Sequence, residues 1–276
     1  MIDAARLQRL IERLQARAQP ALLADLVVFR VADVDAGHAQ PEVASFVAQH
    51  VAGFGWRDGV LVMSDDARDI DARTTLLADA AMKLRDAGLI RGWRNEALAV
   101  GQPALSTIER AACRPLGITT EAVHLNAYAG TDHLFVARRA AHKQIDPGLW
   151  DNLVGGMVSA GETLQQTLER EAWEEAGLRI DFDSLIRGRR FQMRRPVSEG
   201  LQSEIIHVYD ANLPADASLA NQDGEVAAIE RRALDEVVDA IERDEFTLES
   251  ALVTLESLTR GSPGETPAPF YQRLAS

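Results

Sequence analysis

The chain of 276 residues is 46% hydrophobic, enough for one large domain or for two modest domains with cores of their own. Its 29 lysines and arginines stand against 42 aspartates and glutamates, which gives a formal net charge of −13. This balance argues against a nucleic-acid partner held through its phosphates and against an anionic membrane surface. A small phosphorylated substrate stays possible, because a bound divalent metal can reverse the sign of the local charge.

The first half of the chain predicts an α+β unit. Apolar residues at i, i+3, i+4 and i+7 predict an amphipathic helix over residues 3–18. Further elements are expected in chain order: strands at 26–31 and 59–63, a helix ending near Gly88, a strand at 92–101 and a small helix at 108–112. The stretch 114–118 is the expected junction between an N-terminal domain, 1–116, and a C-terminal domain, 117–276.

The second half predicts a second α+β unit. A helix is expected over residues 162–176, with Gly177 as its left-handed C-cap. Strands are expected at 121–128, 133–140, 191–195 and 204–213, a loop or irregular strand at 146–156, and late helices at 234–242 and 248–259. A tail rich in proline and glycine follows.

A single cysteine, Cys113, excludes an internal disulfide and a cysteine-rich zinc site. Its flanks resemble the end of a small helix, so we expect a buried apolar side chain in preference to a reactive thiol. The chain does not open with a secretory signal, and no apolar run approaches the roughly 18–20 residues of a membrane span. We therefore expect a soluble cytoplasmic protein, with a homodimer left open.

Residues 170–177, REAWEEAG, concentrate acid in one turn of the predicted helix. Glu171, Glu174 and Glu175 stand at i, i+3 and i+4, so their carboxylates share one face and repel one another unless a cation lies between them. The longer run GMVSAGETLQQTLEREAWEEAGL fits the spacing G-x5-E-x7-R-E-U-x-E-E-x-G-U, where U is apolar. The fixed positions are Gly156, Glu162, Arg170, Glu171, Ala172, Glu174, Glu175, Gly177 and Leu178.

This run resembles the Nudix box and matches it at every fixed position. The resemblance implies a Nudix α/β/α sandwich behind a smaller N-terminal α+β domain. It also implies hydrolysis of a nucleoside diphosphate linked to a further group, or of another organic diphosphate, with a small-molecule substrate as the partner.

The acidic face suits a hard divalent cation, Mg²⁺ or Mn²⁺, which prefers carboxylate and phosphate oxygens. Glu171, Glu174 and Glu175 would supply ligands, with Glu174 and Glu175 also in catalytic roles, since such a cation neutralises developing charge and activates water. The resemblance implies the carbonyl oxygen of Gly155 as a further ligand. We expect Glu162 and Arg170 to form an ion pair that holds the loop against the helix.

Basic and amide side chains just before the box are candidates for substrate binding. We expect Arg138, Arg139, Lys143 and Asn152 to meet phosphate oxygens, although ordinary surface charge at a strand end would look the same. Trp150 would either stack on a ring or lie in the core.

Two later glutamates are candidates for the general base. Glu225 lies in a turn after the box, where Nudix enzymes often place a base or an extra metal ligand, and Glu204 is the alternative. A base in a mobile loop can close over the substrate.

Segments outside the box narrow the resemblance to one subgroup, the Nudix proteins related to the domain fused in fungi to thiamine pyrophosphokinase. These segments are 92–100, 123–128, 143–162, 198–210 and 222–226. The subgroup implies hydrolysis of damaged thiamine diphosphate to the monophosphate. In GWRNE, residues 92–96, Trp93 is the candidate for contacting the non-phosphate half of the substrate, and a tryptophan in the core is the alternative.

Three other functions are weighed against this one. A general diphosphatase for nucleoside diphosphates or dinucleotides would carry the same box. A non-catalytic ligand-binding module would usually have an eroded box, whereas this one is intact. Isopentenyl diphosphate isomerase shares a similar stretch around Trp150, but its reaction uses a cysteine that residues 151–157 lack.

Overall fold

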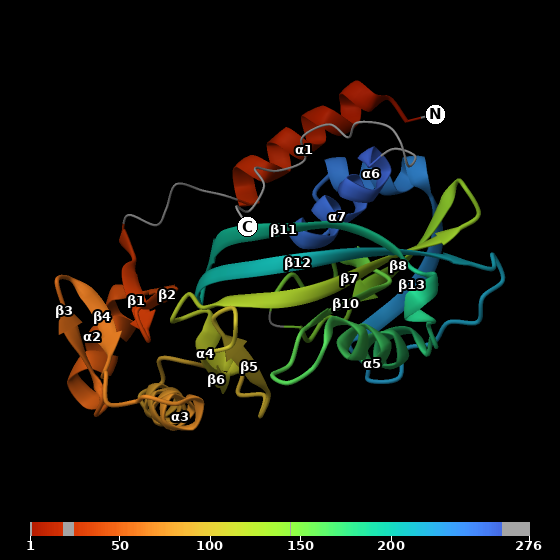
Figure 1. Cartoon of the computed structure of the whole chain (residues 1–276). Helices are drawn as coiled ribbons and strands as arrows, with labels where there is room; N and C mark the ends of the chain where they lie inside the picture. The colour runs from red at the N-terminus through yellow and green to blue at the C-terminus, as the bar shows by residue number, and fades with distance from the viewer. Residues whose placement is uncertain (1, 19–24, 144, 261–276) are drawn as a thin grey trace.

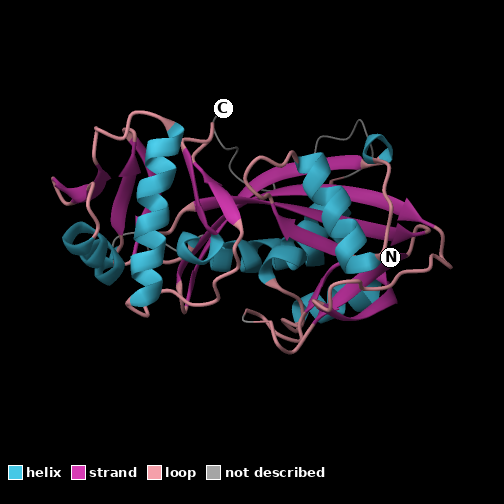
Figure 2. Ribbon diagram, turned by 90° about the horizontal axis from the view of Figure 1, so that it is seen from below, coloured by secondary structure: helices cyan, strands magenta, loops and turns pink. Residues whose placement is uncertain are grey.

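The computed structural model describes residues 2–18, 25–143 and 145–260, and it has the α+β class that the sequence predicts. A small N-terminal unit lies beyond one end of a large C-terminal sheet (Figure 1). Figure 2 shows the same arrangement from below, with the small sheet set to one side of the long strands.

The N-terminal unit contains a four-stranded sheet in the order β2-β1-β4-β3 and a separate β5-β6 hairpin. Its elements are β1 (Val27–Val31), β2 (Val34–Ala39), α2 (Pro41–His50), β3 (Phe54–Arg57), β4 (Val60–Met63), α3 (Ile70–Asp86), β5 (Ala97–Val100), β6 (Ser106–Glu109) and α4 (Arg110–Cys113). β1, β4, α3 and α4 agree with the predicted elements, but the strand expected over 92–101 is a loop as far as β5. β2, α2, β3 and β6 escaped prediction because they are short and give little periodic signal.

The first helix, α1 (Ala4–Ala18), belongs by its packing to the C-terminal half of the molecule. Its buried face, Leu7, Leu10, Ile11 and Leu14, joins the core cluster of the late helices. Arg6 also forms an ion pair with Asp239 at 2.7 Å. The helix itself agrees with the amphipathic pattern, but the core of the expected N-terminal domain begins only at β1. The predicted domain boundary between residues 116 and 117 stays a prediction. The first helix, which this boundary assigns to the N-terminal domain, packs on the core of the C-terminal unit.

The C-terminal unit is built on a seven-stranded sheet in the order β11-β12-β7-β8-β13, to which β10 and β9 pair at β7 and β8. β7 and β12 run parallel, and the other pairs are antiparallel. The strands are β7 (Thr119–Ala129), β8 (His133–Arg139), β9 (Trp150–Asn152), β10 (Val154–Met157), β11 (Ile186–Val197), β12 (Gly200–Leu213) and β13 (Val226–Ala233).

Helices cover both faces of this sheet. α1, α6 (Leu234–Glu242) and α7 (Leu248–Thr259) bury one face, and α5 (Leu164–Ala176) buries the other. The bounds of α6 and α7 agree with the predicted helices. Trp150 lies in the core under α6 and α7, 6% exposed, so the core alternative holds for this residue. No helix of the described ranges is long and apolar enough to cross a membrane.

Local sequence explains both ends of α5. Thr163 is the N-cap, because its side chain accepts a hydrogen bond from the backbone N–H of Gln166 while the Gln166 side chain reaches back. Gly177 ends the helix at φ 62° and ψ 21°, the left-handed conformation that glycine adopts without strain. The acidic face is therefore presented on a helix with both termini defined.

The burial of Cys113 predicts an unreactive thiol. Its side chain is 3% exposed, and burial raises the pKa of the thiol to about 12. At pH 8 only about one thiol in ten thousand would then be ionised. We expect no modification of the folded protein by iodoacetamide at pH 8, and one modified site per chain in concentrated guanidinium chloride, measured by mass spectrometry. Rapid labelling of the folded protein would contradict this expectation.

Candidate active site

Arg170 lies at the centre of the acidic face of α5. Its guanidinium donates to both carboxylate oxygens of Glu162 at 2.9 Å, so the predicted ion pair is present. The same guanidinium donates to Glu171 at 2.7 Å and to Glu174 at 3.1 Å. One cation therefore offsets part of the repulsion among the helix carboxylates.

Glu175 is the most buried carboxylate of this face. It is 9% exposed, and its Oε2 accepts a hydrogen bond of 2.8 Å from the N–H of Gly155. Burial, and then the charge of Glu171, raises the pKa of Glu175 well above its usual range. Burial also raises the pKa of Glu171 to about 7, although Arg170 opposes this. The face therefore holds more negative charge than its surroundings compensate.

Gly156 is required by the close approach of the loop to Glu171. A Cβ atom at this position would lie 2.1 Å from the Glu171 carboxyl group, which is closer than atoms can pack. The box glycine thus allows β10 to lie directly against the acidic face.

The donor set fits a hard divalent cation. Glu171, Glu174 and Glu175 offer oxygen ligands only, and two of them are buried with raised pKa values. In the described part of the chain, however, no three acidic, histidine or cysteine side chains already surround one point. Glu171 and Glu174 would have to exchange their contacts with Arg170 for contacts with the ion.

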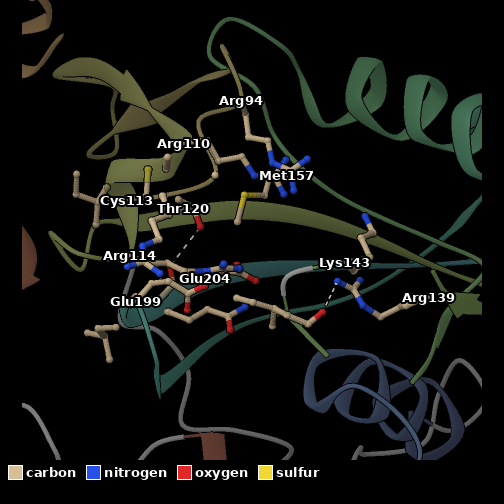
Figure 3. A pocket seen from close by; sticks show the side chains of 18 residues that line it. Arg94, Arg110, Cys113, Arg114, Thr120, Arg139, Lys143, Met157, Glu199 and Glu204 are labelled. Carbon is tan, nitrogen blue, oxygen red and sulfur yellow. Dashed lines mark hydrogen bonds between the residues drawn. The ribbon is translucent and has the colours of Figure 1, made fainter. Parts of the chain in front are cut away.

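A cavity with two adjoining lobes lies beside β10, and no described residue of α5 lines either lobe. The box lobe includes Gly155, Gly156, Met157, His124, Asp151 and Glu249. The outer lobe includes Arg91, Arg94, Lys143, Glu199 and Ser203 (Figure 3). Both lobes share Arg110, Arg114, Arg139, Ile145, Met157, Gln202 and Glu204. In a chain of net charge −13, the shared arginines together with Arg91, Arg94 and Lys143 make the outer lobe favourable for an anionic ligand.

Two of the predicted substrate-binding residues line the cavity. Arg139 reaches it from the end of β8 and donates to Asp151 at 2.9 Å. Lys143 lies at the outer lobe and forms an ion pair with Glu225. Their place beside the box agrees with a role in binding phosphate.

Arg138 is not among the described residues that line the cavity, so its role in binding phosphate stays a prediction that its position does not support. Its Nε donates to the carbonyl of Gly148 at 3.1 Å, and its guanidinium lies 5.6 Å from the centre of the Trp150 ring. Successive residues of a strand face opposite sides, so Arg138 points away from the side that Arg139 occupies.

Asn152 is likewise not placed for direct substrate contact. It is 3% exposed, and its amide donates to Asn126 at 2.8 Å and to Thr254 at 3.2 Å. Its Oδ1 lies 3.0 Å from Nδ1 of His124, which lines the box lobe. Asn152 holds the strands beside the box in place, because every polar atom of its amide has a partner within the core.

Trp93 packs against the N-terminal core instead of the cavity. Its Nε1 donates to Asn95 at 2.8 Å, and Arg85 lies 4.8 Å from the ring centre. It is not among the described residues that line either lobe, so the core alternative fits it better than substrate contact. Its neighbour Arg94 does line the outer lobe.

The sequence reasoning missed Arg110 and Arg114. They stand at i and i+4 on and just after α4, so one turn brings both to the cavity. Arg110 donates to Glu96 at 2.7 Å. The signal was present in RAACR, whose two arginines stand four residues apart at the end of the predicted small helix.

The two candidates for the general base lie in different surroundings. Burial would raise the pKa of Glu225, but the hydrogen bond from Lys143 and the charges of Arg110 and Arg94 outweigh it and lower the pKa. Burial, and then the charge of Glu249, raises the pKa of Glu204. Glu225 is therefore ionised at neutral pH, as a base must be, and Glu204 is disfavoured in that state.

Two family models match the chain. The family described as "NUDIX domain" matches residues 119–252, and the family described as "Domain of unknown function (DUF4743)" matches residues 6–120.

Curated relatives extend across both regions. The chain is 30% identical over 212 residues to "Nudix hydrolase 20, chloroplastic" of Arabidopsis thaliana, covering 74% of this chain and 57% of that protein. It is 29% identical over 220 residues to an uncharacterized protein of Saccharomyces cerevisiae, covering 70% and 64% respectively. The chain thus spans less than two thirds of the length of each of these relatives.

Solved structures include a Deinococcus radiodurans protein that is 23% identical, with a TM-score of 0.45. The match covers 57% of this chain and 96% of that one.

The close contact at Gly156 predicts the effect of adding one methyl group. Gly156→Ala should displace Glu171, lower the free energy of unfolding by about 1–3 kcal/mol, and weaken Mn²⁺ binding by at least about tenfold. The measurements are urea denaturation and titration calorimetry.

Gly55→Ala is the matched control, because a Cβ atom there meets nothing within 4 Å. We expect this control to change unfolding by less than about 1 kcal/mol and to leave Mn²⁺ binding as it is. Equal behaviour of the two variants would refute the role given to Gly156.

Proposed function

The chain carries a NUDIX domain behind a DUF4743 domain, and on this premise we propose that it is a diphosphatase that cleaves the anhydride bond of an organic diphosphate. One arrangement carries the proposal. The carboxylates of α5, whose negative charge is only partly neutralised, lie against Gly155 and Gly156 of β10, and residues of the same strand line the arginine-rich cavity. A diphosphate bound in the outer lobe, where Lys143 and Arg110 lie close enough to act on the charges of Glu175 and Glu171, would have its anhydride near the acidic face.

Each group has a part in the proposed reaction. Glu171, Glu174, Glu175 and the carbonyl of Gly155 would hold Mg²⁺ or Mn²⁺, which would neutralise phosphate charge and make a bound water more acidic. Arg170 and Glu162 hold the helix and loop together. Lys143 and Arg94, in the outer lobe, would bind phosphate oxygens.

Glu225 is the proposed general base, and it is held in the ligand-free state by the substrate-binding groups. It pairs with Lys143 and lies 4.0 Å from Arg94. Phosphate oxygens compete for the same two cations, so substrate binding would release the Glu225 carboxylate to accept a proton from water.

For the substrate we propose damaged thiamine diphosphate, hydrolysed to the monophosphate. The segments that resemble the thiamine-related subgroup include Arg94 and Gln202, which line the cavity. Glu199 also lines it, and its carboxylate is suited to face the cationic thiazolium ring of thiamine diphosphate, a charge that the oxo form lacks. A cytoplasmic location and a homodimer stay predictions.

The metal and the substrate are tested together. With Mg²⁺ present, we expect thiamine diphosphate or its oxo form to be hydrolysed with a higher kcat/KM than ADP-ribose or a dinucleotide. Glu174→Gln should lower kcat by at least about 100-fold on every substrate, because it removes a charged ligand. Phosphate release is the measurement.

Full activity in excess EDTA would contradict the role of the metal. Higher kcat/KM for ADP-ribose or the dinucleotide would favour the general diphosphatase, and no turnover of any substrate would favour the binding module.

The assignment of the base gives a separate prediction. Glu225→Gln should lower kcat by about 100-fold or more without raising KM, because its carboxylate acts in the chemical step and competes with phosphate for Lys143 and Arg94. Glu230→Gln, an exposed glutamate on β13, serves as the control and should retain wild-type kcat. If Glu204→Gln lowers kcat strongly and Glu225→Gln leaves kcat nearly at the wild-type value, Glu204 is the base.

A further inference from the structure

Three residues that line the box lobe each carry an unpartnered polar atom. In the described part of the chain, five buried side-chain nitrogen or oxygen atoms lack a hydrogen-bond partner. Three of them belong to residues that line this lobe: Nε of Arg114, Nε of Arg139 and Oε2 of Glu249. Leaving a buried donor or acceptor unpaired costs free energy, so such a group of two donors and one acceptor requires an explanation.

Glu249 is held in one orientation by its other oxygen. Oε1 accepts from Nε2 of Gln202 at 2.6 Å and from Arg195 at 3.3 Å, while Arg195 also donates to Gln202 at 2.8 Å. Glu249 is 7% exposed and lies in the first turn of α7. Oε2 is thus an acceptor with a fixed position on a residue that lines the cavity.

The charges around this group disfavour a phosphate there. Glu249 and the neighbouring Glu204 both present carboxyl groups, and burial followed by the charge of Glu249 raises the pKa of Glu204. Phosphate oxygens only accept hydrogen bonds, so they would be repelled by Glu249. A group that both donates and accepts would satisfy Glu249 and the arginines together.

We propose that Arg114, Arg139 and Glu249 form a subsite for the non-phosphate half of the substrate, which selects a polar group such as a nitrogen heterocycle carrying a hydrogen-bond donor beside an acceptor. Arg114 and Arg139 donate to the acceptor, and Glu249 Oε2 accepts from the donor. This inference rests on the proposed diphosphatase function and adds the basis of its selectivity.

The subsite is tested by substrates that differ in the organic half. Thiamine diphosphate and ADP-ribose carry hydrogen-bond donors on nitrogen, whereas isopentenyl diphosphate carries a hydrocarbon. Glu249→Gln keeps Oε1 as an acceptor and replaces Oε2 with a donor. We expect kcat/KM to fall by at least about tenfold for the donor-bearing substrate that the wild type hydrolyses best, and by less than about threefold for isopentenyl diphosphate.

Two further variants distinguish a loss of the subsite from a loss of the folded state. Arg114→Lys keeps the charge and the apolar stem but removes the Nε donor, and it should shift selectivity in the same direction. Glu245→Gln, an exposed glutamate paired with Arg243, is the control and should change neither substrate. The melting temperature of each variant shows whether it remains folded.

The outcomes separate this subsite from the proposed function. Equal losses on all substrates in both folded variants would overturn the subsite while the diphosphatase stands. If the wild type hydrolyses none of the probes, the diphosphatase fails, and titration calorimetry with thiamine monophosphate and AMP decides the subsite. Binding of either ligand weakened at least about tenfold in both variants supports it, and unchanged or absent binding overturns it.

Discussion

The central physical constraint on this molecule is the excess of negative charge on one face of α5. Arg170 bridges Glu162, Glu171 and Glu174 but leaves Glu175 to a backbone N–H. Because Glu171 and Glu175 are largely buried, water does not screen their charges, and the pKa values of both rise. The protein therefore maintains a costly arrangement whose natural complement is a divalent cation.

The surroundings of α5 are shaped by this arrangement. Gly156 lets β10 approach Glu171 without a clash, and the N–H of Gly155 reaches Glu175. The capping box at Thr163 and the left-handed Gly177 define the ends of the helix that carries the acids. At the end of β9, the buried amide of Asn152 connects His124 to Thr254 of α7. Any shift of the strands would leave a buried polar group of this network without a partner, at a cost in free energy. The network therefore favours a single geometry of the strands.

The N-terminal unit supplies positive charge to the cavity. Arg94 and Arg110 reach the cavity from the N-terminal region, where Arg110 is paired with Glu96. Glu225 is held between Lys143 and Arg94, so groups from both halves meet at one ion-paired cluster. The N-terminal region is thus part of the cavity wall as well as a folding unit, which gives a physical reason for its presence beside the sheet that carries the acidic helix.

The sequence alone determined the features that depend on local spacing. The acidic face of α5, the Glu162–Arg170 pair, the glycine cap and the late helices follow from residues a few positions apart, for which helix geometry sets the distances. Tertiary structure decided the features that depend on which faces meet. It placed α1 on the C-terminal core, turned Arg138 away from the cavity, buried Asn152 and Trp150, and brought Arg114, Arg139 and Glu249 together from three distant segments. An amphipathic pattern says that a face will be buried, but the partner that buries it is chosen by packing across the whole chain.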